Sequence, residues 1–264
     1  INGVELVAGA DVSEKALKSF AEQFGVKQTF TDYKKMLRLK DLDAVSVCTP
    51  NYMHKAPTVA ALRAGKHVMV EKPMAMNARE AQAMVDAAKE AKRKLVIGFQ
   101  YRFSPEAQAV KRYVDDGQIG RPLFARVQTL RRRGIPSWGV FGRKDLQGGG
   151  PLIDLGVHYI EVALYLMGSP SAVSASGSAY TYIGNKPSKT LCSWGHWDHK
   201  SYTVEDLAVG FVRLDNGACM TVESSFAAHI EKDDFNLQIM GEKGGFTLHP
   251  PAIYKDEAGL MVNV

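Results

Sequence analysis

The chain has 264 residues, of which 45% are hydrophobic and 23% charged, and this supplies enough apolar side chains for two domains with their own cores. Its formal net charge is a modest +5 and its basic residues are scattered, so we expect no nucleic-acid partner. The chain has three widely spaced cysteines, no apolar run of about 18 residues and no signal-peptide pattern, which predicts a cytoplasmic protein without membrane spans or a disulfide framework.

The N-terminal part alternates short apolar runs with helical patterns. Ser13 is expected to cap the first helix, and Gly25 is expected to end it. Strands separated by helices predict parallel βαβ units, and hence an α/β Rossmann-type doubly wound sheet over residues 1–103. Strands are expected at 4–10, 44–48, 68–70 and 95–99, and helices at 13–24, 55–64 and 78–91.

The pattern changes after about residue 104. Asp215-Asn216-Gly217 favours a tight hairpin, and strands joined by hairpins predict an α+β domain with a mostly antiparallel sheet over 104–264. The run 218–226 carries apolar residues on both faces, so we expect a homodimer or homotetramer formed through this sheet. Helices are expected at 104–114 and 152–167, and strands at 123–130, 172–182, 204–214, 218–226, 235–240 and 245–248.

Polar residues follow the predicted parallel strands, at the edge where ligands of such sheets bind. Asp11 ends the first strand, where an acidic residue accepts hydrogen bonds from ribose hydroxyls and repels a 2′-phosphate; this favours NAD over NADP. Alternatively, Asp11 only stabilises the start of the following helix. The other strand-end segments are Thr49-Pro50-Asn51, Glu71-Lys72-Pro73 and Gln100-Tyr101.

The glycine-rich phosphate loop of a Rossmann fold is expected about 20 residues before such an acid. Ten residues precede Asp11 and they lack the G-x-G-x-x-G pattern, while Gly148-Gly149-Gly150 lies too far along the chain. We therefore expect the chain to begin after the first strand and the phosphate loop. A protein that truly lacked this loop would bind a dinucleotide poorly, because the pyrophosphate would lose its backbone donors.

Two of the strand-end segments carry groups that could bind a cofactor or take part in catalysis. The turn from Thr49 to His54 can lay backbone and amide groups along a cofactor, or it is simply a proline-rich surface turn. Lys72 in a crevice can bind a substrate hydroxyl and polarise it, because partial burial lowers a lysine pKa. The alternative is an exposed Glu71–Lys72 pair before a turn.

Asp154 and His158 are four residues apart in an apolar helical pattern, so they share a face. Ionisable groups in such surroundings are costly unless they are paired or used. Histidine suits general base catalysis near neutral pH, and a nearby carboxylate orients it and raises its basicity. The structural alternative is a capping aspartate and a hydrogen-bonded core histidine.

The irregular segment 184–202 offers a second set of polar side chains. Cys192, His196 and His199 have a spacing that fits no common zinc pattern, so we expect no metal site. Trp194 and Trp197 in the same segment either stack on a sugar or cover the sheet.

Taken together, these motifs resemble the glucose–fructose oxidoreductase, inositol dehydrogenase and rhizopine-catabolism (Gfo/Idh/MocA) family. The resemblance covers nearly the whole chain and implies a Rossmann-type domain, a sheet domain of the glucose-6-phosphate dehydrogenase type, NAD(P) and sugar-like substrates. It also implies that Lys72, Asp154 and His158 are the catalytic residues. The implied cofactor-binding residues are Asp11, Thr49, Pro50, Asn51, His54, Glu71, Lys72 and Gln100.

The motifs thus predict an NAD(P)-dependent oxidoreductase that moves a hydride between nicotinamide and a secondary alcohol of a sugar, cyclitol or sugar acid. His158 would take the hydroxyl proton, Asp154 would orient substrate and histidine, and Lys72 would stabilise alkoxide charge. Further contacts with the substrate, or alternatively with nicotinamide, are expected from Tyr101, Arg102 and Trp138. Two alternatives are an NAD-dependent glycoside hydrolase of the same fold and a non-catalytic dinucleotide-responsive regulator.

Overall fold

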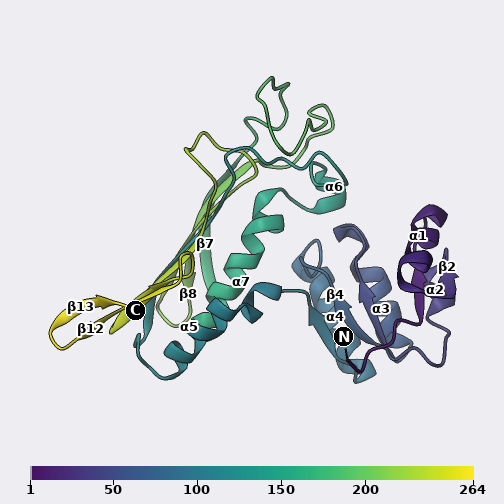
Figure 1. Cartoon of the computed structure of the whole chain (residues 1–264), viewed down its shortest axis with the longest axis horizontal. Helices are drawn as coiled ribbons and strands as arrows, with labels where there is room; N and C mark the ends of the chain where they lie inside the picture. Colours follow the sequence, from purple (N-terminus) through teal and green to yellow (C-terminus); the bar gives the residue numbers. More distant parts are fainter. Residues whose placement is uncertain (1) are drawn as a thin grey trace. The chain divides into compact units, whose positions relative to one another are not determined.

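The computed structural model describes residues 2–264, which fall into two compact units that divide after Gly98 (Figure 1). The domain boundary expected between residues 103 and 104 stays a prediction. Among the described residues, no helix combines the length and the apolar character that crossing a membrane requires.

The first unit is an α/β structure whose strands are all parallel. One sheet pairs β1 with β2, and a second sheet has the order β3-β4-β5. Its strands are β1 (Ala8–Ala10), β2 (Gln28–Phe30), β3 (Ala44–Val47), β4 (His67–Val70) and β5 (Leu95–Ile97). Its helices are α1 (Glu14–Phe24), α2 (Tyr33–Met36), the 3₁₀ turn η1 (Asn51–Met53), α3 (Lys55–Arg63) and α4 (Ala78–Ala91).

Local capping explains where the first helix begins and ends. The Ser13 hydroxyl accepts a hydrogen bond from the backbone N–H of Ala16, and Gly25 takes the left-handed conformation at φ 69°, which confirms both predicted ends of α1. Leu62, Val70 and Met84 lie at the centre of the unit's hydrophobic core. Ala8 and Phe30 pack against the same cluster, so both small sheets share one core.

The second unit is built on an eight-stranded sheet of order β13-β12-β11-β10-β6-β9-β8-β7. Only the β6–β9 pair is parallel, so the predicted mostly antiparallel sheet is confirmed. Asp215-Asn216-Gly217 joins β8 to β9, and Gly217 has φ 85°. The strands are β6 (Pro122–Leu130), β7 (Ala172–Tyr180), β8 (Leu207–Leu214), β9 (Cys219–Ser225), β10 (Asp234–Gly241), β11 (Gly244–Thr247), β12 (Ala252–Glu257) and β13 (Leu260–Asn263).

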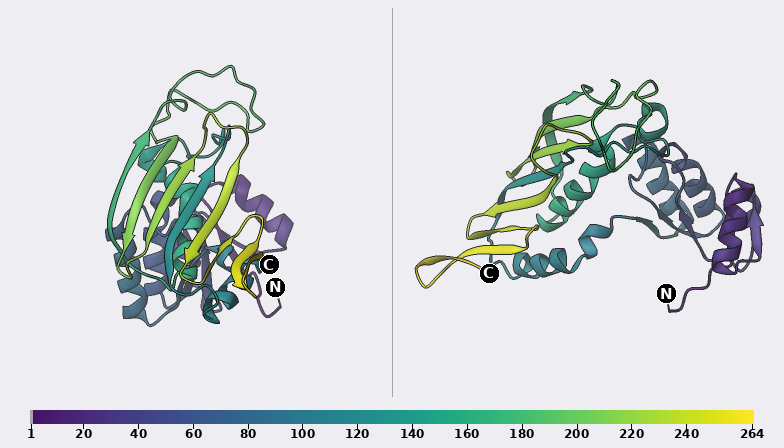
Figure 2. Two further views of the ribbon diagram at one scale, coloured as in Figure 1. Left: turned by 90° about the vertical axis from the view of Figure 1, so that its left-hand side faces the viewer. Right: turned by 45° about the horizontal axis from the view of Figure 1, so that its top comes forward.

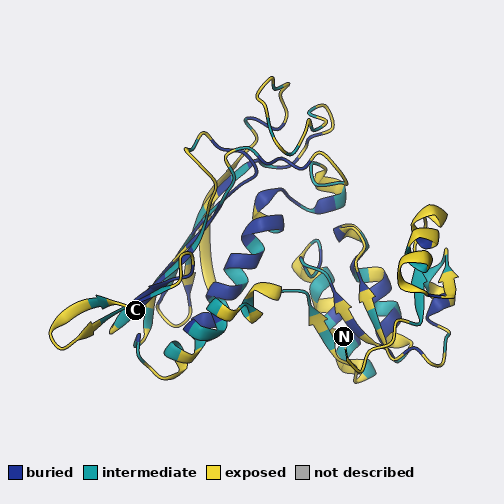
Figure 3. Cartoon of the chain, viewed as in Figure 1, coloured by how far each residue is buried: buried dark blue, intermediate teal, exposed yellow. Residues whose placement is uncertain are grey.

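Helices cover one face of this sheet. The 3₁₀ turn η2 (Gln100–Phe103) leads into α5 (Pro105–Asp115), and α7 (Val157–Leu166) packs on β6 and β10 with most of its surface buried (Figure 3). Val162, Leu166, Val127 and Leu237 belong to the core between helix and sheet. No described helix covers the opposite face, which Figure 2 shows in its left view. The short helix α6 (Lys144–Gln147) precedes the glycine triplet.

The helix expected over 152–167 differs from the observed one at its start. Residues Leu152–Gly156 form a π turn, η3, before the regular α7 begins. A π turn closes i→i+5 hydrogen bonds, is rare, and occurs often at functional sites. The turn therefore marks the segment that carries Asp154.

Candidate functional site

In the first unit, the turns after β3 and β4 leave the sheet at the same edge. Val47 lies opposite Val70 in the parallel register, and the backbone N–H of Glu71 donates to the carbonyl oxygen of Val47 at 2.9 Å. Thr49-Pro50-Asn51 and Glu71-Lys72-Pro73 are therefore neighbours, as the sequence predicted from the shared direction of the strands.

His54 joins these two turns. Its side chain is 1% exposed, Nδ1 lies 2.7 Å from the carbonyl oxygen of Pro73, and Nε2 lies 2.8 Å from that of Thr49. The Thr49 hydroxyl also donates to the carbonyl oxygen of Met53 at 3.1 Å. These contacts hold the two turns in place, and the cofactor contact expected of His54 stays a prediction.

Glu71 and Lys72 are half-buried, which disfavours a solvated surface pair. The Glu71 carboxylate accepts a hydrogen bond from the backbone N–H of Lys72 at 3.3 Å. A Cβ atom added to Gly98 would lie 3.3 Å from the same oxygen, so Glu71 packs closely against the backbone after β5. The Lys72–Pro73 peptide bond is cis.

Asp11 lies exposed just after β1. Its Oδ1 accepts from the backbone N–H of Ser13 at 2.7 Å, so it does support the helix start, as the alternative interpretation predicted. An exposed carboxylate in this position remains able to meet a ribose. The carboxylates of Asp11 and Glu71, with the Thr49 and Asn51 side chains, are the polar groups that a nicotinamide dinucleotide needs for its hydroxyls and amide, so these residues fit that cofactor.

In the second unit, Asp154 and His158 occupy the π turn and the first turn of α7. They are 5% and 8% exposed, so both ionisable groups are buried in a segment whose other residues, apart from Glu161, are mostly apolar. A Cβ atom on Gly156 would lie 3.1 Å from a methyl carbon of Leu152 and 3.4 Å from the Ser224 hydroxyl. The helix start thus packs closely on β9, which holds the two side chains in place.

A carboxylate from a distant part of the chain caps this helix. Glu205 accepts hydrogen bonds from the backbone N–H groups of Gly150 at 2.9 Å and Leu152 at 3.4 Å. A Cβ atom on Gly150 would overlap the Glu205 carbonyl oxygen, so only glycine allows this approach. Sequence analysis missed Glu205 and assigned no role to the glycine triplet.

Two residues near Asp154 and His158 shape their surroundings. The Tyr101 ring lies 4.7 Å from the His158 ring and 5.6 Å from that of Tyr159, centroid to centroid. Arg131 is half-buried, and this burial lowers the pKa of its guanidinium, while the charges of Asp154, Asp233 and Tyr101 act in the opposite direction. Sequence analysis did not single out Arg131.

The other predicted substrate contacts have different surroundings. Arg102 forms an ion pair with Glu161 and lies over the Tyr165 ring at 4.7 Å, so it fastens η2 to α7. Gln100 is exposed in η2. Trp138 is exposed and stacks on Trp194, with ring centroids 5.3 Å apart and planes at 8°.

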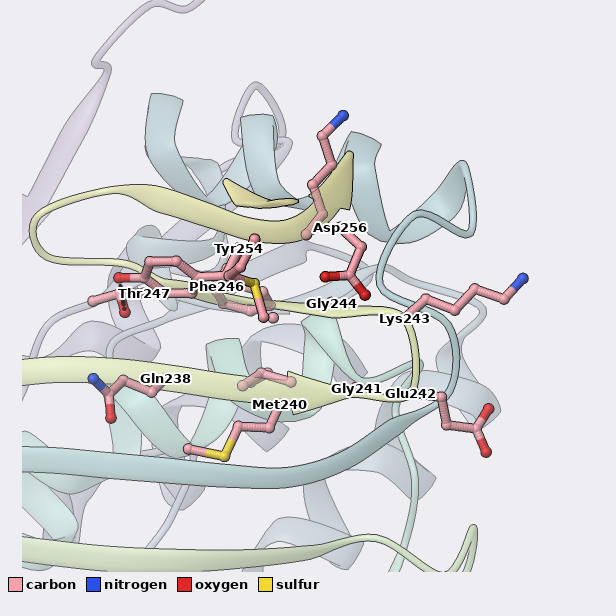
Figure 4. A pocket seen from close by; sticks show the side chains of 14 residues that line it. Gln238, Met240, Gly241, Glu242, Lys243, Gly244, Phe246, Thr247, Tyr254 and Asp256 are labelled. Carbon is pink, nitrogen blue, oxygen red and sulfur yellow. Dashed lines mark hydrogen bonds between the residues drawn. The ribbon is translucent and has the colours of Figure 1, made fainter. Parts of the chain in front are cut away.

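The sheet of the second unit also carries a separate hollow of about 340 Å³ (Figure 4). The side chains of Gln238, Met240, Thr247, Tyr254 and Asp256 line it, on strands β10 to β12. None of the predicted site residues contributes to its lining. Among residues 2–264, no cluster of three His, Cys, Asp or Glu side chains is arranged to hold a metal ion.

Both units match models of known domains. Residues 2–99 match the GFO_IDH_MocA model, described as an oxidoreductase family with an NAD-binding Rossmann fold. Residues 107–247 match the GFO/IDH/MocA C-terminal domain.

Characterised relatives extend over most of the chain. D-Glucoside 3-dehydrogenase of Escherichia coli K12 is 38% identical over 264 residues, which cover 100% of this chain and 75% of the relative. Levoglucosan dehydrogenase of Pseudarthrobacter phenanthrenivorans is 30% identical, over 91% of this chain and 64% of the relative. The chain is thus shorter than the relatives that it matches.

Solved structures agree with these sequence matches. A levoglucosan dehydrogenase in complex with NADH and levoglucosan has a TM-score of 0.82 at 28% identity, covering 98% of this chain and 70% of that one. An oxidoreductase domain protein from Kribbella flavida has a TM-score of 0.85 at 27% identity with the same two coverages.

Proposed function

Because the chain belongs to the Gfo/Idh/MocA family of NAD-binding oxidoreductases, we propose that the protein oxidises a secondary alcohol of a sugar, cyclitol or sugar acid with NAD. The observation that carries this proposal is the buried Asp154–His158 pair at the π turn of an apolar helix, with Tyr101 packed on the imidazole. Buried ionisable groups are costly to keep unless they are paired or used, and a general base with an orienting carboxylate is the use that this arrangement suits.

The proposed reaction gives each residue one task. His158 takes the proton from the substrate hydroxyl, and Asp154 orients that hydroxyl and the imidazole. Lys72 donates a hydrogen bond to the same oxygen and stabilises its developing negative charge. NAD, when bound, supplies the acceptor for the hydride that leaves the carbon. Asp11, Thr49, Pro50, Asn51, Glu71, Lys72 and Gln100 are proposed to contact the cofactor, while His54 fixes the turns that present them.

The names of relatives favour a ring-shaped polyol as substrate. They include a D-glucoside 3-dehydrogenase, a levoglucosan dehydrogenase and a scyllo-inositol 2-dehydrogenase, and each name refers to a cyclic sugar derivative or a cyclitol. NAD is favoured over NADP because Asp11 would repel a 2′-phosphate.

A direct test incubates the full-length protein with NAD and a panel of sugars, glycosides and cyclitols while NADH absorbance is recorded. Substrate-dependent formation of NADH is expected. Release of a sugar from a glycoside without net formation of NADH would contradict the dehydrogenase assignment and favour a glycoside hydrolase. Binding of NAD without turnover of any substrate would indicate a regulator.

We also propose that the protein assembles as a homodimer or homotetramer through the sheet face that no described helix covers. Val209 on β8 and Met240 on β10 expose large apolar side chains on this sheet, and burying such surface stabilises association. Light scattering of the full-length protein is expected to give a multiple of the monomer mass. A monomer at micromolar concentration would contradict this assembly.

A cytoplasmic location is proposed from the three cysteines, Cys48, Cys192 and Cys219, which are all free thiols in the structure. Fractionation of cells that produce the full-length protein tests this location, because recovery in an extracytoplasmic fraction would contradict it.

A further inference from the structure

A column of stacked side chains connects the candidate site to solvent. The Arg131 guanidinium carbon lies 4.1 Å from the centre of the Trp194 ring, and Trp194 stacks on Trp138 with planes at 8°. The edge of Trp138 meets the Phe141 ring at a centroid distance of 6.3 Å. Two segments distant in sequence, 131–141 and the loop around Trp194, thus build one arrangement of flat surfaces.

The column is held by hydrogen bonds to the backbone. The Ser137 hydroxyl donates to the carbonyl oxygen of Trp194 at 2.6 Å, and Arg131 donates to that of Gly134 at 2.9 Å. At the base of the loop, Asp206 accepts from three successive backbone N–H groups, those of Tyr182, Ile183 and Gly184. The tryptophan rings are therefore positioned before any ligand arrives, which reduces the entropy cost of binding.

Trp138 is 55% exposed although its orientation is fixed from two sides. Trp197, by contrast, packs against the core cluster around Phe226 and donates its indole N–H to the carbonyl oxygen of Gly184 at 2.7 Å. Covering the sheet accounts for Trp197 but leaves Trp138 without a role. A rigid, exposed indole face suits a flat apolar ligand surface.

The inner end of the column adjoins the strand that supports the π turn. The backbone N–H of Arg131 donates to the carbonyl oxygen of Ser225 at 3.1 Å, and the neighbouring Ser224 hydroxyl donates to that of Pro151 at 2.8 Å, just before η3. Arg131 interacts electrostatically with Asp154 and Tyr101, and Tyr101 packs on His158. A sugar ring whose hydroxyl is presented to His158 therefore has Arg131 at one side. A second ring joined to that sugar would extend toward Trp194 and Trp138.

We propose that Arg131, Trp194 and Trp138 form a subsite for a second ring, so that the preferred substrate is a glycoside with a cyclic aglycone. This inference rests on the proposed dehydrogenase function and specifies its substrate class. The shared ligand chemistry is a flat ring face, which both a pyranose and an aryl group provide. Arg131 adds donors for the hydroxyl or bridging oxygen between the rings.

The test compares Trp138→Ala with the unaltered full-length protein on glucose, a methyl glucoside, a disaccharide and a phenyl glucoside. We expect kcat/KM for the two-ring substrates to fall about tenfold, the size of one stacking contact, while the one-ring substrates change less than about twofold. Trp138→Phe should recover part of the loss. Leu191→Ala, at a 93% exposed position of the same loop, is the matched control. Comparing the loss on the disaccharide with the loss on the phenyl glucoside shows whether the subsite prefers a sugar ring or an aryl ring as the aglycone.

An equal loss on one-ring and two-ring substrates, or no loss on either, would overturn the subsite. Equilibrium binding of the disaccharide and of glucose, measured by calorimetry, gives a second reading that needs no turnover. Trp138→Ala should weaken the disaccharide alone. If the unaltered protein forms no NADH with any sugar, the proposed function fails. In that case the subsite stands only if the calorimetric difference is present, and is rejected if it is absent.

Discussion

The Tyr101 ring packs on the His158 imidazole, with centroids 4.7 Å apart and planes at 53°. Tyr101 comes from η2 and His158 from the first turn of α7, so two elements of the second unit fix one ring. A general base has to be aligned with the proton that it takes, and this contact restricts the rotation of the imidazole.

Replacing His158 by Ala is expected to lower kcat by about 10²–10⁴, the usual contribution of a positioned base. His67→Ala is the matched control, since His67 is exposed at the start of β4, at the opposite end of that strand from Lys72. Steady-state kinetics with NAD and the best substrate measure the effect. Nearly normal turnover of the His158 variant would remove this residue from catalysis.

Replacing Lys72 by Ala is expected to lower kcat by about 10²–10³, because one donor to the developing oxyanion is lost. Lys94→Ala, at the residue before β5, provides a lysine control away from the strand ends that face the ligand. Single-turnover measurement of NADH formation separates this effect from slow product release. A change in KM at constant kcat would instead assign Lys72 to ground-state binding.

His54 offers a prediction about positioning rather than chemistry. His54→Ala removes both contacts, to Thr49 and Pro73, and is expected to lower kcat about tenfold or more, because misplaced groups lose rate steeply. His54→Gln, which keeps one amide donor, should recover part of the rate. If both variants have a lower melting temperature but the same kcat as the unaltered protein, the residue has a purely structural role.

Asp11 should set the choice between the two nicotinamide cofactors. Asp11→Ser removes the charge that repels a 2′-phosphate, so the NADP/NAD ratio of kcat/KM is expected to rise about tenfold. Glu14→Ser, in the first turn of α1, removes a nearby charge as a control. An unchanged ratio would limit Asp11 to its hydrogen bond with Ser13.

The buried phenol of Tyr159 leads us to expect that the free energy of unfolding decreases at alkaline pH. Burial raises the pKa of its phenol well above the ordinary value of 10.0, with a smaller contribution from Tyr101. Above about pH 10 the unfolded state releases this proton while the folded state keeps it, so the free energy of unfolding falls as pH rises. Tyr159→Phe should lessen this fall in thermal denaturation between pH 8 and about pH 11. An identical slope would show that other groups control it.

Local signals in the sequence were sufficient for much of the fold. Ser13 and Gly25 mark the ends of α1, and Asp215-Asn216-Gly217 marks a hairpin, because capping and turn geometry depend on few adjacent residues. Strands β12 and β13 were not predicted. Both are short and lie at one end of the sheet, β13 as the edge strand and β12 next to it, and Ile253 is their one buried side chain, so they lack the apolar alternation that reveals a strand.

The candidate site was only partly predictable, since some of its supports come from distant segments. Glu205 lies 55 residues from Gly150, and no spacing rule relates a loop carboxylate to a helix start so far away. Arg131 is one of three consecutive arginines, 131–133, and the sequence alone does not tell them apart. In the structure the three separate, with Arg131 on Trp194, Arg132 bonded to the carbonyl oxygen of Glu231, and Arg133 beside His229. Only tertiary contacts distinguish them.

Strand β6 is synthesised before every other strand of its sheet, yet it ends up in the interior, between β9 and β10. The bond between Thr129 and Ser224 spans 95 residues, so both edges of β6 stay without strand partners while the ribosome makes most of the second unit. Such open edges invite pairing with other nascent chains. The yield of folded protein should therefore depend on how quickly the later strands emerge, and slowing translation after β6 should increase aggregation.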